Sequence, residues 1–196
     1  MNNIEIYNEL KEKLKNNVSE KRYEHVMSVK KFSEDILNKH KIDDKKIING
    51  IKISVISHDL FRDISDDKMI KKSLEYGLIP NALEKNTPIL LHGKISAEYL
   101  KNNYSIDNEV YKAIYFHTSG NVCFKTIGKI LIISDTLEYN REFKGVEKLR
   151  KISFENLEKG FFNVIKNRIN FAVKNDLPIL KETYTLYNKL RGEQNV

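Results

Sequence analysis

Apolar residues recur at intervals of three and four along most of this chain, and no other feature constrains its fold as strongly. One face of an α-helix repeats at this interval, whereas a half-buried β-strand repeats at every second residue. The clearest apolar stripes lie within residues 7–14, 26–37, 47–56 and 154–173. We therefore expect an all-α protein, a helical bundle in which these stripes face a common core.

Start and stop signals set the limits of the expected helices. Ser19 is predicted to cap the helix that carries the 26–37 stripe, and Asp43 to cap the helix that carries the 47–56 stripe. Further helices are expected at 65–77, 93–103, 107–117, 126–139, 153–175, and from Pro178 through Leu190.

Two of these segments, 47–57 and 127–135, are rich in β-branched residues and would also suit buried strands. No Asn-Gly or Asp-Gly hairpin turn flanks either segment. Helices are therefore the preferred interpretation, and strands remain the alternative for these two segments.

Length and composition narrow the class of protein. A chain of 196 residues is long enough to bury one core, and it has no apolar run of the length that a membrane span needs. Its single cysteine, Cys123, excludes a disulfide framework and a zinc site built mainly from thiolates. The first residues are acidic and amphipathic, unlike a secretory signal, so we expect a cytoplasmic protein with no membrane partner.

The net charge of +7 suggests an anionic partner, but its distribution does not suit nucleic acid. The basic residues are mostly lysines, 28 against 6 arginines, and they are interleaved with acidic residues. A nucleic-acid-binding surface concentrates its basic residues along one stripe. We therefore expect a small anionic substrate and no nucleic acid. No motif indicates a protein partner, which leaves a homodimer open.

The histidines carry the chemistry. Among the five, His58 is followed directly by Asp59, and this pair can direct an imidazole and a carboxylate to one place. These ligands together suit divalent ions such as iron, manganese or zinc, and a carboxylate can bridge two ions where an imidazole cannot. His40 has no ligand partner in the pattern and is interpreted as a surface residue.

Five motifs then follow in order along the expected helices. They are R-Y-x-H at 22–25, H-D at 58–59, L-L-H-G at 90–93, H-T-x-G at 117–120, and D-x-x-E-x-x-R-x-F at 135–143, which leads into G-V-E-x-L-R at 145–150. The series resembles the HD-domain metal-dependent phosphohydrolases, and the flanking residues are similar to those of the YqeK-type hydrolases. The resemblance covers about residues 21–175.

The resemblance implies a single HD domain over 1–196, with a motif core at 21–150 on which C-terminal helices at 153–191 pack. It also implies symmetrical hydrolysis of diadenosine tetraphosphate to two ADP by a metal-activated water. Two divalent ions are implied, with iron as the first choice and manganese or zinc as alternatives. The first ion would be held by His25, His58, Asp59 and Asp135. Asp59 would bridge to the second ion, which His92 and His117 would complete.

Supporting roles follow from the same resemblance. Catalytic roles fall to Asp59, Arg62 and Asp63, and substrate contacts to Arg22, Thr118, Ser119, Gly120, Glu138 and Arg141. The chain departs from the family pattern at Tyr139-Asn140, which stands where Pro-Gly is usual, beside a loop that could contact the nucleotide. Two alternatives stay open: an HD phosphohydrolase for another nucleotide, such as a nucleoside monophosphate or a cyclic dinucleotide, and a non-catalytic metal-stabilised nucleotide-binding module.

Overall fold

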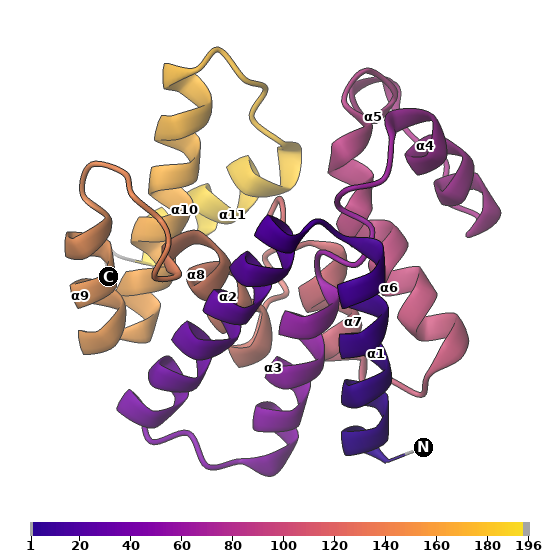
Figure 1. The fold of residues 1–196 in the computed structure, drawn as a ribbon. Coiled ribbons are helices and arrows are strands. Elements are labelled where there is room, and N and C mark those ends of the chain that lie inside the picture. The colour runs from indigo at the N-terminus through magenta and orange to yellow at the C-terminus, as the bar shows by residue number, and fades with distance from the viewer. Residues whose placement is uncertain (1, 194–196) are drawn as a thin grey trace.

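The computed structural model of the chain describes residues 2–193, and these residues form helices joined by turns, with no strand among them (Figure 1). The all-α prediction is therefore confirmed. In chain order the helices are α1 (Asn3–Asn17), α2 (Glu20–Lys39), α3 (Lys45–Ser57), α4 (Asp66–Glu75), α5 (Ala82–Asn86), the 3₁₀ helix η1 (Pro88–Leu91), α6 (His92–Asn103), α7 (Asn108–Tyr115), α8 (Thr126–Leu137), α9 (Val146–Glu155), α10 (Leu157–Lys174) and α11 (Lys181–Glu193).

The two segments with strand-like composition, now α3 and α8, are helices packed among several others. Helix α8 contacts α2, α3, α7, α9 and α10, and α3 contacts α1, α2, α7 and α8. Helix α8 buries Ile127 and every residue from Ile130 through Ser134. A helix covered on all sides needs apolar residues all round, so its β-branched run reflects burial and not strand structure.

Two predicted helix limits are wrong, for local reasons. The cap of α3 is Asp44 and not Asp43, because the Asp44 carboxylate accepts hydrogen bonds from the backbone N–H groups of Lys46 and Ile47. The expected helix at 153–175 is two helices, because the Asn156 side chain accepts from the Lys159 N–H and starts α10. The cap predicted at Ser19 is confirmed by its bond to the Arg22 N–H.

Helices α9 and α10 lie side by side across this break (Figure 1). Gly160 allows their close approach, because a Cβ atom there would lie 2.6 Å from the Cα of Ser153. The apolar spacing stays in register across Asn156, so periodicity alone does not reveal that the chain turns back. Helix α10 also packs on α8, and α11 packs on α10.

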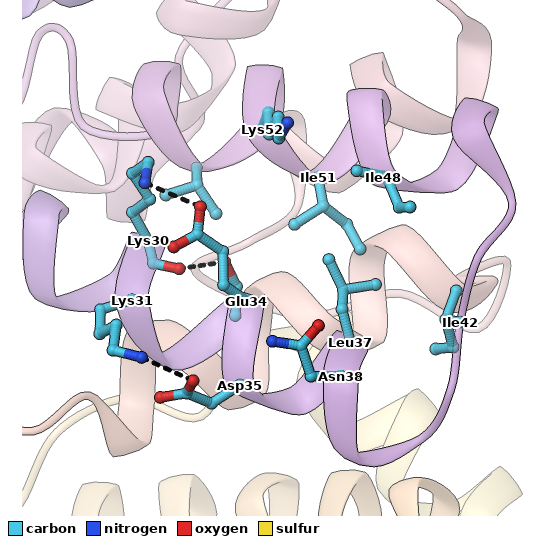
Figure 2. Close-up of a pocket in the computed structure, with 12 residues that line it drawn as sticks. Lys30, Lys31, Glu34, Asp35, Leu37, Asn38, Ile42, Ile48, Ile51 and Lys52 are labelled. Atoms are coloured by element: carbon cyan, nitrogen blue, oxygen red, sulfur yellow. Dashed lines mark hydrogen bonds and ion pairs between the residues drawn. The ribbon is translucent and has the colours of Figure 1, made fainter.

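A groove of about 340 Å³ lies between α2 and α3 (Figure 2). Apolar side chains such as Ile48 and Ile51 line it, and the ion pairs Lys30–Glu34 and Lys31–Asp35, each 2.7 Å, lie along α2. None of the predicted ligand or substrate residues lines this groove.

Within residues 2–193, no helix has both the length and the apolar character that crossing a membrane would require.

Candidate metal centre

Six side chains from separate parts of the chain meet in the interior of the bundle. They come from α2, the end of α3 and the turn after it, the start of α6, the turn after α7, and α8, and they are His25, His58, Asp59, His92, His117 and Asp135. All are buried except Asp135, whose side chain is 18% exposed. The structure thus brings together all six residues that the motifs predict as ligands.

The six side chains form two groups of three. His25, His58 and Asp135, here the Asp135 cluster, offer ligand atoms within 4.8 Å of one another, and so do Asp59, His92 and His117, here the His92 cluster.

The two oxygens of Asp59 face different clusters. Its Oδ2 lies 3.8 Å from Nε2 of His25 and 3.7 Å from Nε2 of His58. Its Oδ1 lies 3.2 Å from Nε2 of His92 and 3.9 Å from Nε2 of His117. One carboxylate therefore reaches both clusters, which is the arrangement expected of a bridging ligand.

A single local arrangement orients three of the imidazoles. His58, His92 and His117 each stand directly after the last residues of a helix or helical turn, and each donates Nδ1–H to the carbonyl three residues earlier. Carbonyls at a helix end are not fully used by the helix and can accept such a bond, although those of Ile89 and Ile114 also accept the backbone N–H of the same histidine. Because a carbonyl can only accept, the proton lies on Nδ1, and Nε2 presents its lone pair to the site.

His25 is oriented differently, from a distant part of the chain. Its Nδ1 lies 3.1 Å from Oε1 of Glu138, which is buried just after α8. This contact directs Nε2 of His25 toward Oδ1 of Asp135, at 3.2 Å. Glu138, predicted to contact substrate, thus lies behind a ligand histidine, and its substrate contact stays a prediction.

The nitrogen atoms of the site fit cations. The Nε2 atoms of His25 and His58 are buried and make no hydrogen bond within the described residues. The Nε2 atoms of His92 and His117 lie only 2.9 Å apart, although both Nδ1 atoms already carry the protons. Two lone pairs at that distance repel unless a positive charge lies close to both. The donor set therefore suits divalent metal ions.

Both carboxyl groups of the site ionise readily. Burial alone would raise the pKa of Asp59, but the surrounding imidazoles, His58 before the others, hold that pKa well below its usual value. Burial also opposes ionisation of Asp135, yet the adjacent imidazole of His25 holds the pKa of this carboxyl far below its ordinary range. Ionised carboxylates are the form that binds metal.

The imidazoles of His25 and His117 differ in the metal-free protein. Burial alone would lower the pKa of His25, but the adjacent carboxylates of Asp135 and Glu138 raise it to about 9. Burial lowers the pKa of His117 to about 3, and the neighbouring His92 and His58 act in the same direction. At neutral pH His25 therefore carries a positive charge between carboxylates, while His117 keeps its lone pair.

A pocket of about 410 Å³ opens beside His25. Its lining residues come from the start of α2 and the loop after α8, and they are Ser19, Lys21, Arg22, Glu24, His25, Glu138, Asn140 and Arg141. The guanidinium of Arg22 donates to Oδ2 of Asp59 at 3.0 Å, and that of Arg141 lies 3.6 Å from Oδ1 of Asp135. The structure thus places two of the predicted substrate residues, both cationic, at the edge of the metal centre.

Asp63 and Arg62 lie beside the ligands without belonging to either cluster. Oδ2 of Asp63 accepts hydrogen bonds from the backbone and hydroxyl of Ser19, at 2.9 and 2.7 Å, so Asp63 holds the start of α2. Its Oδ1 lies 3.6 Å from Nε of Arg22. Burial lowers the pKa of the Arg62 guanidinium, and the nearby Asp59 opposes that shift. The catalytic roles assigned to both residues stay predictions.

The predicted phosphate turn at 118–120 packs against the C-terminal helix. Gly120 has a left-handed φ of 74°, and a Cβ atom there would lie 2.7 Å from Leu186 of α11. The Ser119 carbonyl accepts a hydrogen bond from the Thr183 hydroxyl at 2.7 Å. Thr118, Ser119 and Gly120 do not line the pocket beside His25, and their substrate contacts stay predictions.

Tyr139, which departs from the family pattern, ties the loop after α8 to α2. Its hydroxyl donates to Asp35 at 2.7 Å, and its ring centroid lies 5.2 Å from that of Phe32. The Arg150 guanidinium lies 5.8 Å from the same ring. These contacts join the loop to α2, while Tyr139 as a whole stays 45% exposed.

One residue that contacts the site was not found from the sequence. Arg168, on α10, donates to Oδ2 of Asp135 at 3.1 Å and to the carbonyl of His117 at 2.6 Å. It lies more than thirty residues from either partner, and no local motif marks it as part of the centre.

No family model matches the chain. It is similar to the symmetrical bis(5'-nucleosyl)-tetraphosphatase of Halalkalibacterium halodurans, with 31% identity over 92% of this chain and 95% of that protein. It is 28% identical to the protein of the same name from Bacillus subtilis, over 90% of this chain and 93% of that one. Its fold matches the crystal structure of a predicted HD superfamily hydrolase involved in NAD metabolism from Clostridium acetobutylicum, with a TM-score of 0.84, 29% identity, and coverage of 95% and 97%.

Proposed function

This chain belongs to the family of YqeK-type HD hydrolases, the symmetrical bis(5'-nucleosyl)-tetraphosphatases, and we propose that it hydrolyses diadenosine tetraphosphate and related dinucleoside polyphosphates. Water would add at one inner phosphorus, and each molecule of substrate would yield two ADP. The observation that carries the proposal is one buried carboxylate, Asp59, whose two oxygens face two clusters of nitrogen and oxygen ligands.

The six clustered side chains would hold two divalent ions, one in each cluster, with Asp59 between them. Such ions would neutralise phosphate charge and make a water molecule acidic enough to supply the nucleophile. The four imidazoles and the carboxylates suit iron, manganese and zinc. Iron is the proposed metal, because the YqeK-type resemblance implies it.

The chain's own cations would bind the polyphosphate. Arg22 and Arg141 line the pocket beside His25, and each guanidinium has a planar set of donors that matches phosphate oxygens. Arg62 and Asp63 would assist the reaction from the turn after α3. Glu138 would keep the His25 ring in place while the substrate binds on its other side.

We expect protein loaded with Fe²⁺ or Mn²⁺ to convert diadenosine tetraphosphate to ADP alone. Water would attack one inner phosphorus, and the bond that breaks would be the one that joins the two central phosphates. Chromatography of the products checks this result. A mixture of ATP and AMP would show asymmetric cleavage and contradict the proposal. Turnover of only a nucleoside monophosphate or a cyclic dinucleotide would favour another HD phosphohydrolase activity, and nucleotide binding without turnover would favour a binding module.

Replacement of Arg141 by alanine should raise KM roughly tenfold and change kcat little, because it removes a partly exposed charge-assisted contact to phosphate. Steady-state kinetics with metal-loaded protein measure both constants. Lys144→Ala is the matched control, since it removes an exposed positive charge from the same loop. Loss of bound metal in Arg141→Ala, with an unchanged KM, would instead assign Arg141 to the support of Asp135.

A further inference from the structure

Arg168 is a cation placed behind the metal centre and not in the substrate pocket. Its side chain is only 18% exposed, and it does not line the pocket beside His25. All three guanidinium nitrogens are engaged. Nη1 donates to the carbonyls of His117 and Thr118 at 2.6 and 3.0 Å, Nη2 to Asp135 at 3.1 Å, and Nε and Nη2 to the Thr136 hydroxyl at 3.2 and 2.9 Å.

These partners belong to different clusters. Asp135 is a member of the Asp135 cluster, and His117 is a member of the His92 cluster. Apart from Asp59, which lies between the clusters, Arg168 is therefore a side chain in contact with both sets of ligand residues. Its hydrogen bonds join α10 to the turn after α7 and to the last turn of α8.

The same contact selects the oxygen that Asp135 offers. Its Oδ2 is engaged by Arg168, whereas Oδ1 lies 3.2 Å from Nε2 of His25 and 3.9 Å from Nε2 of His58. A carboxylate held in this way presents one oxygen to a cation in a fixed direction. A lysine could neutralise the charge but could not hold four acceptors with one planar group.

We propose that Arg168 is a positioning residue that sets the spacing of the two metal clusters and restricts Asp135 to one ligand oxygen. The proposal rests on the proposed two-metal site. It assigns Arg168 no contact with substrate, and it predicts that metal affinity depends on the shape of this side chain as well as on its charge.

The test is a titration of metal-free protein with Mn²⁺. Calorimetry measures the affinity, and electron paramagnetic resonance shows whether the bound ions are coupled. Arg168→Met should weaken Mn²⁺ binding about 10- to 100-fold, as loss of a group that orients a ligand does. The spectrum should also lose the signature of two spin-coupled ions. Arg168→Lys should recover part of the affinity without restoring the coupled signature. Lys166→Met, which removes an exposed charge from the same helix, is the matched control and should bind like wild type.

A second variant separates positioning from folding. Thr136→Val removes one acceptor of Arg168 while keeping the side-chain shape, and it should weaken Mn²⁺ binding less than Arg168→Met does. Circular dichroism of the metal-free proteins shows whether each variant is folded. A folded Arg168→Met protein with wild-type affinity and a coupled spectrum would overturn the proposal. If Arg168→Met does not fold, a Thr136→Val protein that binds Mn²⁺ as tightly as wild type would overturn the proposal instead.

These outcomes are independent of the reaction. Wild-type protein that binds two Mn²⁺ ions but releases no ADP would contradict the proposed activity, while the comparison with the Arg168 variants would still decide the positioning role. Wild-type protein that binds no metal would contradict both.

Discussion

Replacement of Asp59 by alanine is expected to remove both metal ions from the protein and to abolish hydrolysis. Among residues 2–193 the Asp59 carboxylate alone has an oxygen toward each cluster, 3.7 Å from Nε2 of His58 and 3.2 Å from Nε2 of His92. Its loss also leaves His92 and His117 without the carboxylate of their cluster, and leaves Asp135 as the remaining carboxylate of the six ligands. Activity should fall by more than about 10³-fold, beyond the effect of losing an outer partner of a ligand.

Elemental analysis of purified Asp59→Ala, together with the product assay, measures this prediction. Asp67→Ala is a suitable control, because Asp67 is an exposed acid in the first turn of α4 and should leave metal content unchanged. Asp59→Asn keeps the size of the side chain and tests the charge separately. Two metal ions per chain in Asp59→Ala would refute the bridging role.

Replacement of Gly93 by alanine should displace His117 and empty the His92 cluster. A Cβ atom at Gly93 would lie 2.6 Å from Cε1 and 2.7 Å from Nδ1 of His117. It would also lie 2.9 Å from the carbonyl oxygen of Ile114, which is backbone and accepts the Nδ1–H of the same ring. The ring cannot move away without losing that bond or its place beside His92.

The expected loss in Gly93→Ala is one metal ion per chain, about 10- to 100-fold in activity, and about 1–3 kcal/mol in the free energy of unfolding. Metal analysis, kinetics and thermal denaturation measure the three quantities. Gly192→Ala serves as the control, because no atom lies within 4 Å of a Cβ added there. Full metal content in Gly93→Ala would show that the ring has room to move, and would leave the glycine of the L-L-H-G motif unexplained.

Local sequence signals predicted most of the helices. Ser19 is the cap of α2 as predicted, and the expected helices at 93–103, 107–117 and 126–139 correspond to α6, α7 and α8. The errors occur where local signals compete. Asp43 and Asp44 are equivalent candidates in sequence, and only the second places its carboxylate on the free N–H groups of α3. The break at Asn156 falls within an unbroken apolar pattern, since Phe154, Leu157 and Phe161 keep a spacing of three and four across it.

The family resemblance implied the six proposed ligands and also their division between two ions, with Asp59 as the bridge. Only the structure shows how the two oxygens of Asp59 are shared between the clusters. Which oxygen of Asp59 faces His58 and which faces His92 depends on how α3 meets α6. The contact of Glu138 with Nδ1 of His25 was not predicted, because the two residues lie 113 positions apart in the sequence.

The sequence by itself determined the helical class, the approximate positions of the longer helices and the order of the ligand motifs, because periodicity, capping and short motifs act between residues that are close along the chain. Only the tertiary structure decided that Arg168 braces two ligands, that Gly93 makes room for the His117 ring, and that Tyr139 packs against α2. These contacts join residues on separate helices. They depend on the separation and rotation of packed helices, which no pattern confined to one helix encodes.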